Sequence, residues 1–142
     1  MNNKFKAIVL NQSGDKFSRE VKNLDTSFFK SGNVLVKVDY SGLNYKDALI
    51  LRNGAKLVKE YPHIPGIDFS GQVKESDSPD FKPGDDVVVT GSKIGELHPG
   101  GYSQLVKVKS ELLVKKPKSI SNKNAMILGT AGFTSLLCAF AI

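Results

Sequence analysis

The run Asn44-Tyr45-Lys46-Asp47 brings together side chains that can bind a ligand. An amide and a phenol both donate and accept hydrogen bonds, and a carboxylate accepts them. The run follows residues 34–39, whose alternation of apolar and polar side chains is typical of a half-buried strand. We therefore expect these side chains at a strand-to-helix corner, where binding groups commonly collect.

The same residues also have a purely structural explanation. Asn44 can cap a helix, and Asp47, three residues later, suits the positive end of a helix dipole. The pair Asn53-Gly54 then ends that helix. In this explanation Tyr45 is a half-buried aromatic residue, so a functional corner and a plain helix cap both remain open.

Other chemical motifs are missing or weak. The sequence contains neither a P-loop nor the Gly-x-Ser-x-Gly turn of a hydrolase. His63 and His98 have no partners at metal-ligand spacing, so we interpret both as loop histidines. Residues 129–132 are too short for a dinucleotide-binding fingerprint. Asp68 is either a buried acid or a local turn-former between prolines and glycines.

Short strands separated by Gly/Pro turns predict a mainly β fold with short helices, arranged as a small barrel or sandwich. The run 82–85, Lys-Pro-Gly-Asp, predicts a type II turn with positive φ at Gly84. The expected strands are an opening hairpin between residues 6 and 21, and further segments at 34–39, 86–90, 102–108 and 112–117. Residues 61–73 are expected to form a loop that enters another strand.

Composition narrows the class of protein. The 142 residues carry a formal net charge of +6 without a block of five basic residues, which indicates a solvated basic surface and no nucleic-acid partner, and leaves an anionic ligand open. The single cysteine, Cys138, excludes an internal disulfide framework. No signal peptide is apparent at the N-terminus, and we expect a cytoplasmic protein.

The composition changes near residue 119, which predicts one domain over 1–118 and the start of another over 119–142. Residues 125–142 carry no charge, and their length lies at the lower limit for a membrane span. Gly, Thr and Ser lower their hydrophobicity, so we expect helices buried in a globular domain and no membrane partner. The partner surface for such helices is missing, and the sequence looks cut short.

Five motifs occur in an order that resembles the N-terminal part of medium-chain dehydrogenase/reductases, especially the acrylyl-CoA reductase and quinone oxidoreductase branch. The resemblance covers nearly the whole chain, and its specificity comes from five motifs in register. They are Leu43-Asn44-Tyr45-Lys46-Asp47-Ala48, Ile64-Pro65-Gly66-Ile67-Asp68-Phe69-Ser70-Gly71, Phe81-Lys82-Pro83-Gly84-Asp85, Gly100-Gly101-Tyr102 and Ile127-Leu128-Gly129-Thr130-Ala131-Gly132-Phe133-Thr134.

This resemblance implies a GroES-like β-barrel followed by the first helices of a truncated NADP-binding Rossmann domain. It implies NADPH in the cleft between the domains and hydride transfer to an activated C=C, as in an enoyl thioester such as acrylyl-CoA, or to a quinone. We expect the full-length enzyme to be a homodimer and the fragment alone to be inactive. The rival hypothesis is a non-enzymatic GroES-like module that binds a partner through its apolar C-terminus.

The resemblance also assigns site residues. It implies that Asn44 and Tyr45 lie beside the nicotinamide and stabilise the enolate-like charge, and that Thr134 contacts the cofactor. Asp68 enters as a weaker candidate that holds the loop or orients its neighbours. Zinc-dependent relatives carry Cys where this chain has Asn44, and Gly-His-Glu where it has Gly66-Ile67-Asp68. The resemblance therefore implies zinc-independent catalysis.

Overall fold

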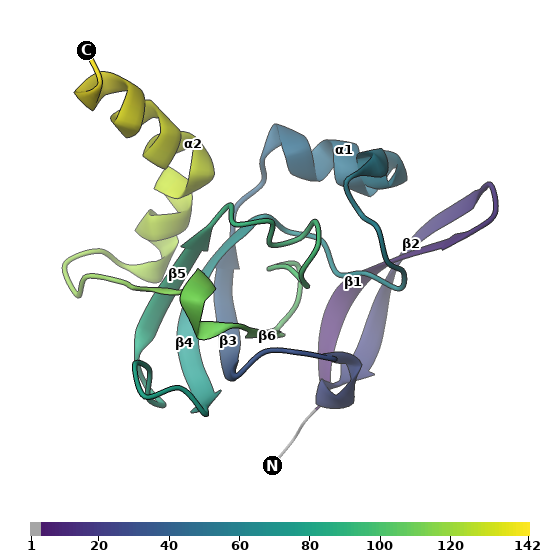
Figure 1. Cartoon of the computed structure of the whole chain (residues 1–142), viewed down its shortest axis with the longest axis horizontal. Coiled ribbons are helices and arrows are strands. Elements are labelled where there is room, and N and C mark those ends of the chain that lie inside the picture. The colour runs from purple at the N-terminus through teal and green to yellow at the C-terminus, as the bar shows by residue number, and fades with distance from the viewer. Residues whose placement is uncertain (1–3) are drawn as a thin grey trace.

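The computed structural model describes residues 4–142, beginning with a long β-hairpin (Figure 1). Strand β1 (Lys4–Ser13) pairs antiparallel with β2 (Lys16–Asp25) along their whole length. The predicted hairpin is confirmed. Its strands are longer than expected because the turn takes up only Gly14 and Asp15, leaving residues 11–13 to the ladder.

A five-stranded antiparallel sheet follows, in the order β6-β3-β4-β5-β7. The predicted type II turn before β5 is confirmed, since Asp85 N donates to the Lys82 carbonyl at 3.0 Å and Gly84 has a φ of 93°. The strands of this sheet are β3 (Val34–Ser41), β4 (Asp68–Ser76), β5 (Asp86–Thr90), β6 (Leu105–Val108) and β7 (Val114–Lys115).

The last strand is shorter than the sequence pattern indicated. The prediction of a strand over 112–117 is wrong at both ends: Ser110–Leu112 form a 3-10 turn, and only Val114–Lys115 pair with β5. Leu113 N bonds back to the Ser110 carbonyl at 3.0 Å, which keeps the chain curled until residue 114. Pro117 has no N–H to extend the ladder.

The main core lies between the hairpin and the five-stranded sheet. Ile8 N donates to the Tyr102 carbonyl, and Gln104 N to that of Lys6, both at 2.9 Å, which holds β1 against the segment before β6. The two sheets form the expected mainly β fold, but they do not close into the continuous hydrogen-bonded ladder of a barrel. Alternate side chains of the strands fill this core, including Phe5, Ala7, Val9, Val34, Val36, Phe69, Val73, Val87, Val89, Val106 and Val108.

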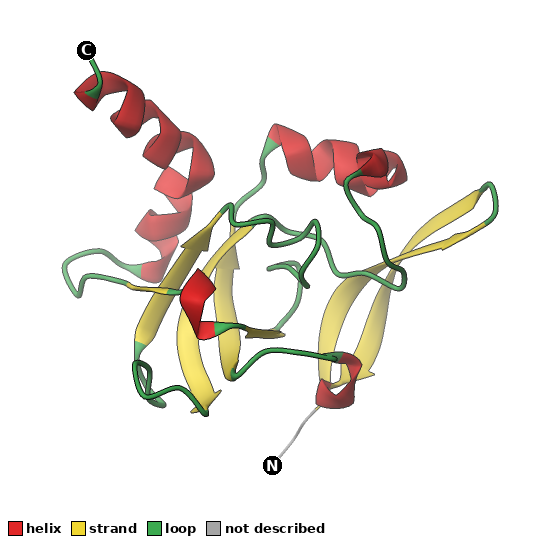
Figure 2. Ribbon diagram, viewed as in Figure 1, coloured by secondary structure: helices red, strands yellow, loops and turns green. Residues whose placement is uncertain are grey.

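Helix α1 (Tyr45–Asn53) is one of the two longer helices in Figure 2. It covers a second, smaller core. Its buried Ile50 packs with Leu10, Val58 and Ile67. The predicted end of the helix is confirmed: Gly54 is the C-cap, in the left-handed conformation at φ 71°. The 3-10 turn Gly54–Lys56 follows α1, and another 3-10 turn, Thr26–Phe28, joins β2 to β3 beside the main core.

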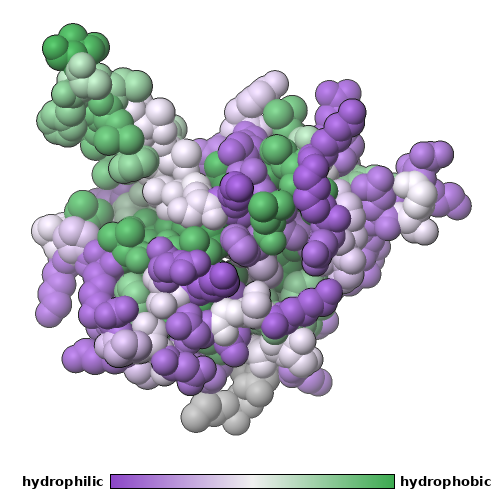
Figure 3. Space-filling model, in the orientation of Figure 1, coloured by the Kyte–Doolittle hydropathy of each residue, from purple (hydrophilic) through white to green (hydrophobic). Residues whose placement is uncertain are grey.

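Helix α2 (Asn122–Phe140) begins against β3, β4 and β5 and then extends away from them to the C-terminus (Figure 1). The expectation of buried helices is wrong for this chain, because one helix forms and its outer half is exposed. Apolar residues gather at this outer end (Figure 3), among them Phe133, Leu136, Leu137 and Phe140. No helix within residues 4–142 is both long and apolar enough to cross a bilayer.

Candidate active site at the corner before α1

Asn44 begins α1 as the sequence predicts. Its backbone is extended, with φ −112° and ψ 161°, and its N–H donates to Asp47 Oδ2 at 2.9 Å. Asp47 occupies the third helical position, where a carboxylate favours the helix N-terminus. The helix-cap explanation is thus correct, and it applies to the same residues that the functional explanation selects.

The side-chain amide of Asn44 bridges two carboxylates. Its Nδ2 lies 3.2 Å from Asp47 Oδ2 and 3.1 Å from Asp68 Oδ2. Both aspartates are fully buried. Because an ionised carboxylate only accepts hydrogen bonds, the amide must turn its NH₂ group toward the pair. Both amide hydrogens of Asn44 are then engaged.

Asp47 also fixes the loop that leads into β4. Its Oδ1 accepts a hydrogen bond from Ile67 N at 2.9 Å. Burial raises the pKa of Asp47 above its usual value, and the nearby charge of Asp68 raises it further. Hydrogen bonds from Asn44 and from the Ile67 backbone lower this pKa in part.

Asp68 is a buried acid at the first position of β4, so the alternative of a local turn-former is wrong. Its Oδ1 accepts from Gly42 N at 3.0 Å, and its Oδ2 accepts from Thr130 N at 3.0 Å as well as from Asn44. Ser41 Oγ donates to the Asp68 carbonyl at 2.7 Å. The carboxylate therefore contacts both the corner and α2.

Tyr102 completes the corner, although we expected no chemical role for it from the sequence. Its hydroxyl donates to the Gly42 carbonyl at 3.1 Å. Burial raises the pKa of Tyr102 strongly, and the charges of Asp47 and Asp68 add to this effect, so the phenol stays protonated. The signal that could have selected it is the Gly100-Gly101-Tyr102 motif, which allows a close approach of the backbone to Gly66 and Asp68.

Tyr45 lies beside this cluster and points into solvent. The expectation of a half-buried ring is wrong: Tyr45 is 82% exposed and the neighbouring Leu43 is 77% exposed. The Tyr45 hydroxyl has no hydrogen-bond partner within the described part of the chain. Next along the helix, Lys46 Nζ pairs with Glu96 Oε1 at 2.9 Å and ties α1 to the loop before β6.

Thr134 lies on the outer half of α2 and is also exposed. Its hydroxyl donates to the Thr130 carbonyl at 2.7 Å, inside the helix. Thr130 in turn bonds to Asp68. The structure thus brings Asn44 and Asp68 into contact, places Tyr45 next to them, and connects Thr134 to them only through one turn of α2.

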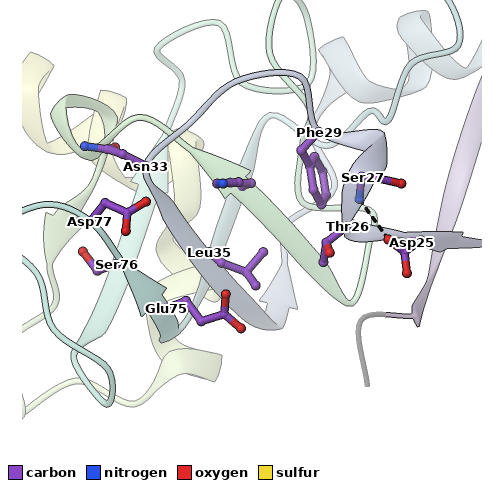
Figure 4. Close-up of a pocket in the computed structure, with 10 residues that line it drawn as sticks. Asp25, Thr26, Ser27, Phe29, Asn33, Leu35, Glu75, Ser76 and Asp77 are labelled. Carbon is purple, nitrogen blue, oxygen red and sulfur yellow. Dashed lines mark hydrogen bonds between the residues drawn. The ribbon is translucent and has the colours of Figure 1, made fainter. Parts of the chain in front are cut away.

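A separate acidic pocket lies at the other end of the β3/β4 pair (Figure 4). Its volume is about 420 Å³, and its walls include the start of β3 and the end of β4. Because these strands are antiparallel, this end is opposite to the Ser41–Asp68 corner. The acidic side chains of this pocket, Asp25, Glu75 and Asp77, are therefore not part of the Asn44 cluster.

Metal-binding groups do not gather in the part of the chain that the structure describes. Among residues 4–142, no three His, Cys, Asp or Glu side chains lie close enough together to hold an ion. His63 is buried, and burial lowers its pKa below the usual 6.5. His63 and His98 both line a small pocket of about 190 Å³.

The fold and this corner define a class of protein that comparison with known proteins confirms. Residues 30–118 match the alcohol dehydrogenase GroES-like domain. The chain belongs to this family and, with the relatives below, to the medium-chain dehydrogenase/reductase superfamily of oxidoreductases, as the five motifs indicated.

Its relatives are longer proteins. Acrylyl-CoA reductase AcuI of Ruegeria pomeroyi is 44% identical over 140 residues, which are 97% of this chain and 42% of the relative. Putative quinone oxidoreductase YhfP of Bacillus subtilis is 42% identical, over 96% of this chain and 42% of the relative. The chain thus spans less than half the length of these curated relatives.

Solved structures give the same result. The yhdH oxidoreductase of Salmonella enterica, in complex with NADP, superposes with a TM-score of 0.90 at 45% identity, over 96% of this chain and 42% of that chain. Bacillus subtilis yhfP, with NAD bound, superposes with a TM-score of 0.92 at 40% identity, over 97% of this chain and 42% of that chain. Both neighbours bind a nicotinamide cofactor.

Proposed function

We propose that this chain is the substrate-side domain of a zinc-independent, NADPH-dependent reductase. The acceptor is an activated C=C, as in an acrylyl-CoA-like enoyl thioester, or a quinone. The names of the relatives and the NADP of the Salmonella structure support this choice. We further propose that the domain extends to residue 118, that residues 119–142 begin a Rossmann domain, and that the full-length enzyme is a cytoplasmic homodimer.

The observation that carries this proposal is the contrast between Asn44 and Tyr45. When hydride adds to a conjugated thioester or quinone, negative charge develops on the carbonyl oxygen, and a preorganised donor stabilises it. Both amide hydrogens of Asn44 already bond to carboxylates. The exposed hydroxyl of Tyr45 is a free donor at the mouth of the corner. In this proposal Tyr45 donates to the acceptor, and Asn44 orients the cluster beneath it.

We propose that the nicotinamide ring of the cofactor binds at this corner. The exposed ring of Tyr45 and the exposed side chain of Leu43 offer an apolar surface at the mouth of the domain. A bound nicotinamide would supply the hydride. Thr134 would contact the cofactor from α2. The glycine-rich turn that recognises a pyrophosphate does not occur in these 142 residues, so we propose that this chain alone is inactive.

Zinc-independence rests on the donor set of the corner. Two positions that bind the metal in zinc-dependent relatives carry Asn44 and Ile67. An Ile side chain cannot coordinate a metal, and the NH₂ group of Asn44 faces two carboxylates. Charge stabilisation by hydrogen bonds replaces Lewis-acid chemistry in this proposal.

The exposed outer half of α2 favours one alternative, a non-enzymatic module that binds a protein partner. NADPH oxidation by the longest encoded chain that contains this sequence separates the two. Acrylyl-CoA and a quinone are offered as acceptors, and NADH is compared with NADPH. Turnover with either acceptor supports the reductase. Its absence with both acceptors, from a folded protein, would refute the enzyme and favour the binding module.

A further inference from the structure

Helix α2 is broken at one residue, Gly129. Its φ of 50° and ψ of −156° are not helical, although the residues on both sides are. This conformation is essentially restricted to glycine. The break divides α2 into an inner half, residues 122–128, and an outer half, residues 130–140. The first N–H groups of a helical segment lack intrahelical acceptors, so Thr130 needs a partner from elsewhere.

The carboxylate of Asp68 supplies that partner. Thr130 N donates to Asp68 Oδ2 at 3.0 Å. The same carboxylate accepts from Asn44 Nδ2 at 3.1 Å and from Gly42 N at 3.0 Å. One buried carboxylate therefore joins the start of the outer half to the loop and the helix cap of the active-site corner.

The space at the break also depends on Asp68. A Cβ atom on Gly129 would lie 2.9 Å from Asp68 Oδ2, too close for an ordinary contact. Glycine is thus required at position 129 for its backbone conformation and for the approach of the carboxylate. The break in α2 therefore lies where the Asp68 carboxylate approaches the helix.

The two halves of α2 are attached to the sheets by different groups. In the inner half, Asn122 Nδ2 donates to Asp39 Oδ2 and the Asn122 carbonyl accepts from Ser70 Oγ, both at 2.7 Å. Within the described residues, the bond from Thr130 to Asp68 is the only hydrogen bond that joins residues 130–142 to an element other than α2. The inner half can therefore stay in place while the outer half changes direction.

We propose that Asp68 is a positioning residue that sets the direction of the outer half of α2 relative to the Asn44 corner. Thr134 lies one turn beyond Thr130, so the same contact sets the position of the proposed cofactor contact. This consequence for catalysis rests on the proposed function. The geometric role of Asp68 does not, because it depends only on hydrogen bonds within this chain.

Hydrogen exchange of backbone amides in the 142-residue chain tests the geometry. In the wild-type protein, Thr130 N–H donates to Asp68, whereas the following N–H groups of a new helical segment are expected to lack an intrahelical acceptor. Thr130 N–H should therefore exchange about tenfold more slowly than Ala131 N–H. Equal exchange at the two amides would overturn the proposal, and this comparison requires no variant.

Two variants and a matched control sharpen the test. Asp68→Asn keeps the shape of the side chain but offers one acceptor oxygen to three donors. The amide exchange rates of residues 130–140 should therefore rise about tenfold, while those of residues 122–128 stay unchanged. Gly129→Ala should give the same pattern by displacing the carboxylate. Asp39→Ala removes the acceptor of Asn122 Nδ2 and should loosen the inner half only. Equal acceleration of both halves in Asp68→Asn and Gly129→Ala would contradict a specific role.

The longest encoded chain gives a second readout. Asp68→Asn should raise the KM for NADPH by about tenfold and should lower kcat less, because it displaces Thr134 but leaves the Tyr45 hydroxyl. Asp68→Glu should restore part of the affinity. An unchanged KM would overturn the link to cofactor binding. If the exchange pattern holds but no NADPH is oxidised, the proposed function fails and the positioning role stands.

Discussion

Asn44 Nδ2 donates a hydrogen bond of 3.1 Å to Asp68 Oδ2, across 24 positions of the sequence. The same nitrogen donates to Asp47 Oδ2 at 3.2 Å. Two buried carboxylates with no cation between them repel each other, and a shared amide donor compensates part of that cost. The arrangement makes Asn44 a structural requirement of the corner, in agreement with its proposed role of orienting the cluster beneath Tyr45.

Replacing Asn44 by Ala should destabilise the protein by about 2–3 kcal/mol, because two buried carboxylates each lose a donor. Urea unfolding of the 142-residue chain measures this loss. The matched control is Asn23→Ala, at an exposed position of β2, which should change stability by less than about 0.5 kcal/mol. Equal losses in the two variants would mean that the Asn44 amide does not stabilise the carboxylate pair.

Replacing Tyr45 by Phe should lower kcat by about tenfold or more in the longest encoded chain while the affinity for NADPH stays nearly unchanged. The substitution keeps the ring and deletes only the free donor. Steady-state kinetics and NADPH titration measure the two effects. Tyr40→Phe, a partly exposed tyrosine on β3, is the control and should keep wild-type kcat. Wild-type kcat in Tyr45→Phe would leave Tyr45 with a packing role only.

His63 should make the protein less stable in mild acid. Burial lowers its pKa below 6.5, and the nearby charge of His98 lowers it further, while Glu60 and a hydrogen bond to the Gly95 backbone raise it in part. The unfolded chain therefore binds the proton first. The stability that His63 contributes is complete above about pH 6.5 and is lost as the pH falls toward the folded-state pKa.

The free energy of unfolding, measured in urea between about pH 7.5 and 5.5, should therefore fall more in the wild-type protein than in His63→Gln. The half-buried His98 provides the control, and His98→Gln should keep most of the wild-type decrease. The same decrease in His63→Gln as in the wild type would assign the acid sensitivity to other groups.

The 142-residue chain should not bind NADPH with micromolar affinity. Helix N-termini and glycine-rich turns supply much of the recognition of a pyrophosphate, and no such turn is present in these residues. Calorimetry at micromolar protein measures the affinity. A micromolar dissociation constant would show that the cofactor site lies elsewhere on this chain.

The purified protein should contain no stoichiometric zinc, because Asn44 and Ile67 occupy the positions that would need a thiolate and an imidazole. Elemental analysis after dialysis against a chelator decides the matter. One tightly bound zinc per chain would contradict the zinc-independent mechanism.

The sequence by itself determined the features that depend on neighbouring residues. The capping residues predict the start and end of α1, and both are confirmed by Asn44 and Gly54. The Pro83-Gly84 turn is confirmed for the same reason, since backbone sterics act within a few residues. The order of five short motifs predicted the superfamily, which the comparisons confirm.

Only the tertiary structure decided how the site is assembled. The bond between Asp68 and Thr130 joins residues 62 positions apart, and the sequence contains no signal for such a partner. The exposure of Tyr45 and the break at Gly129 also depend on how β4 and α2 approach the corner. Local propensity acts along the chain, whereas burial and long-range hydrogen bonds are set by the path of the chain in space, which is why the roles of Asp68 and Thr130 became visible only there.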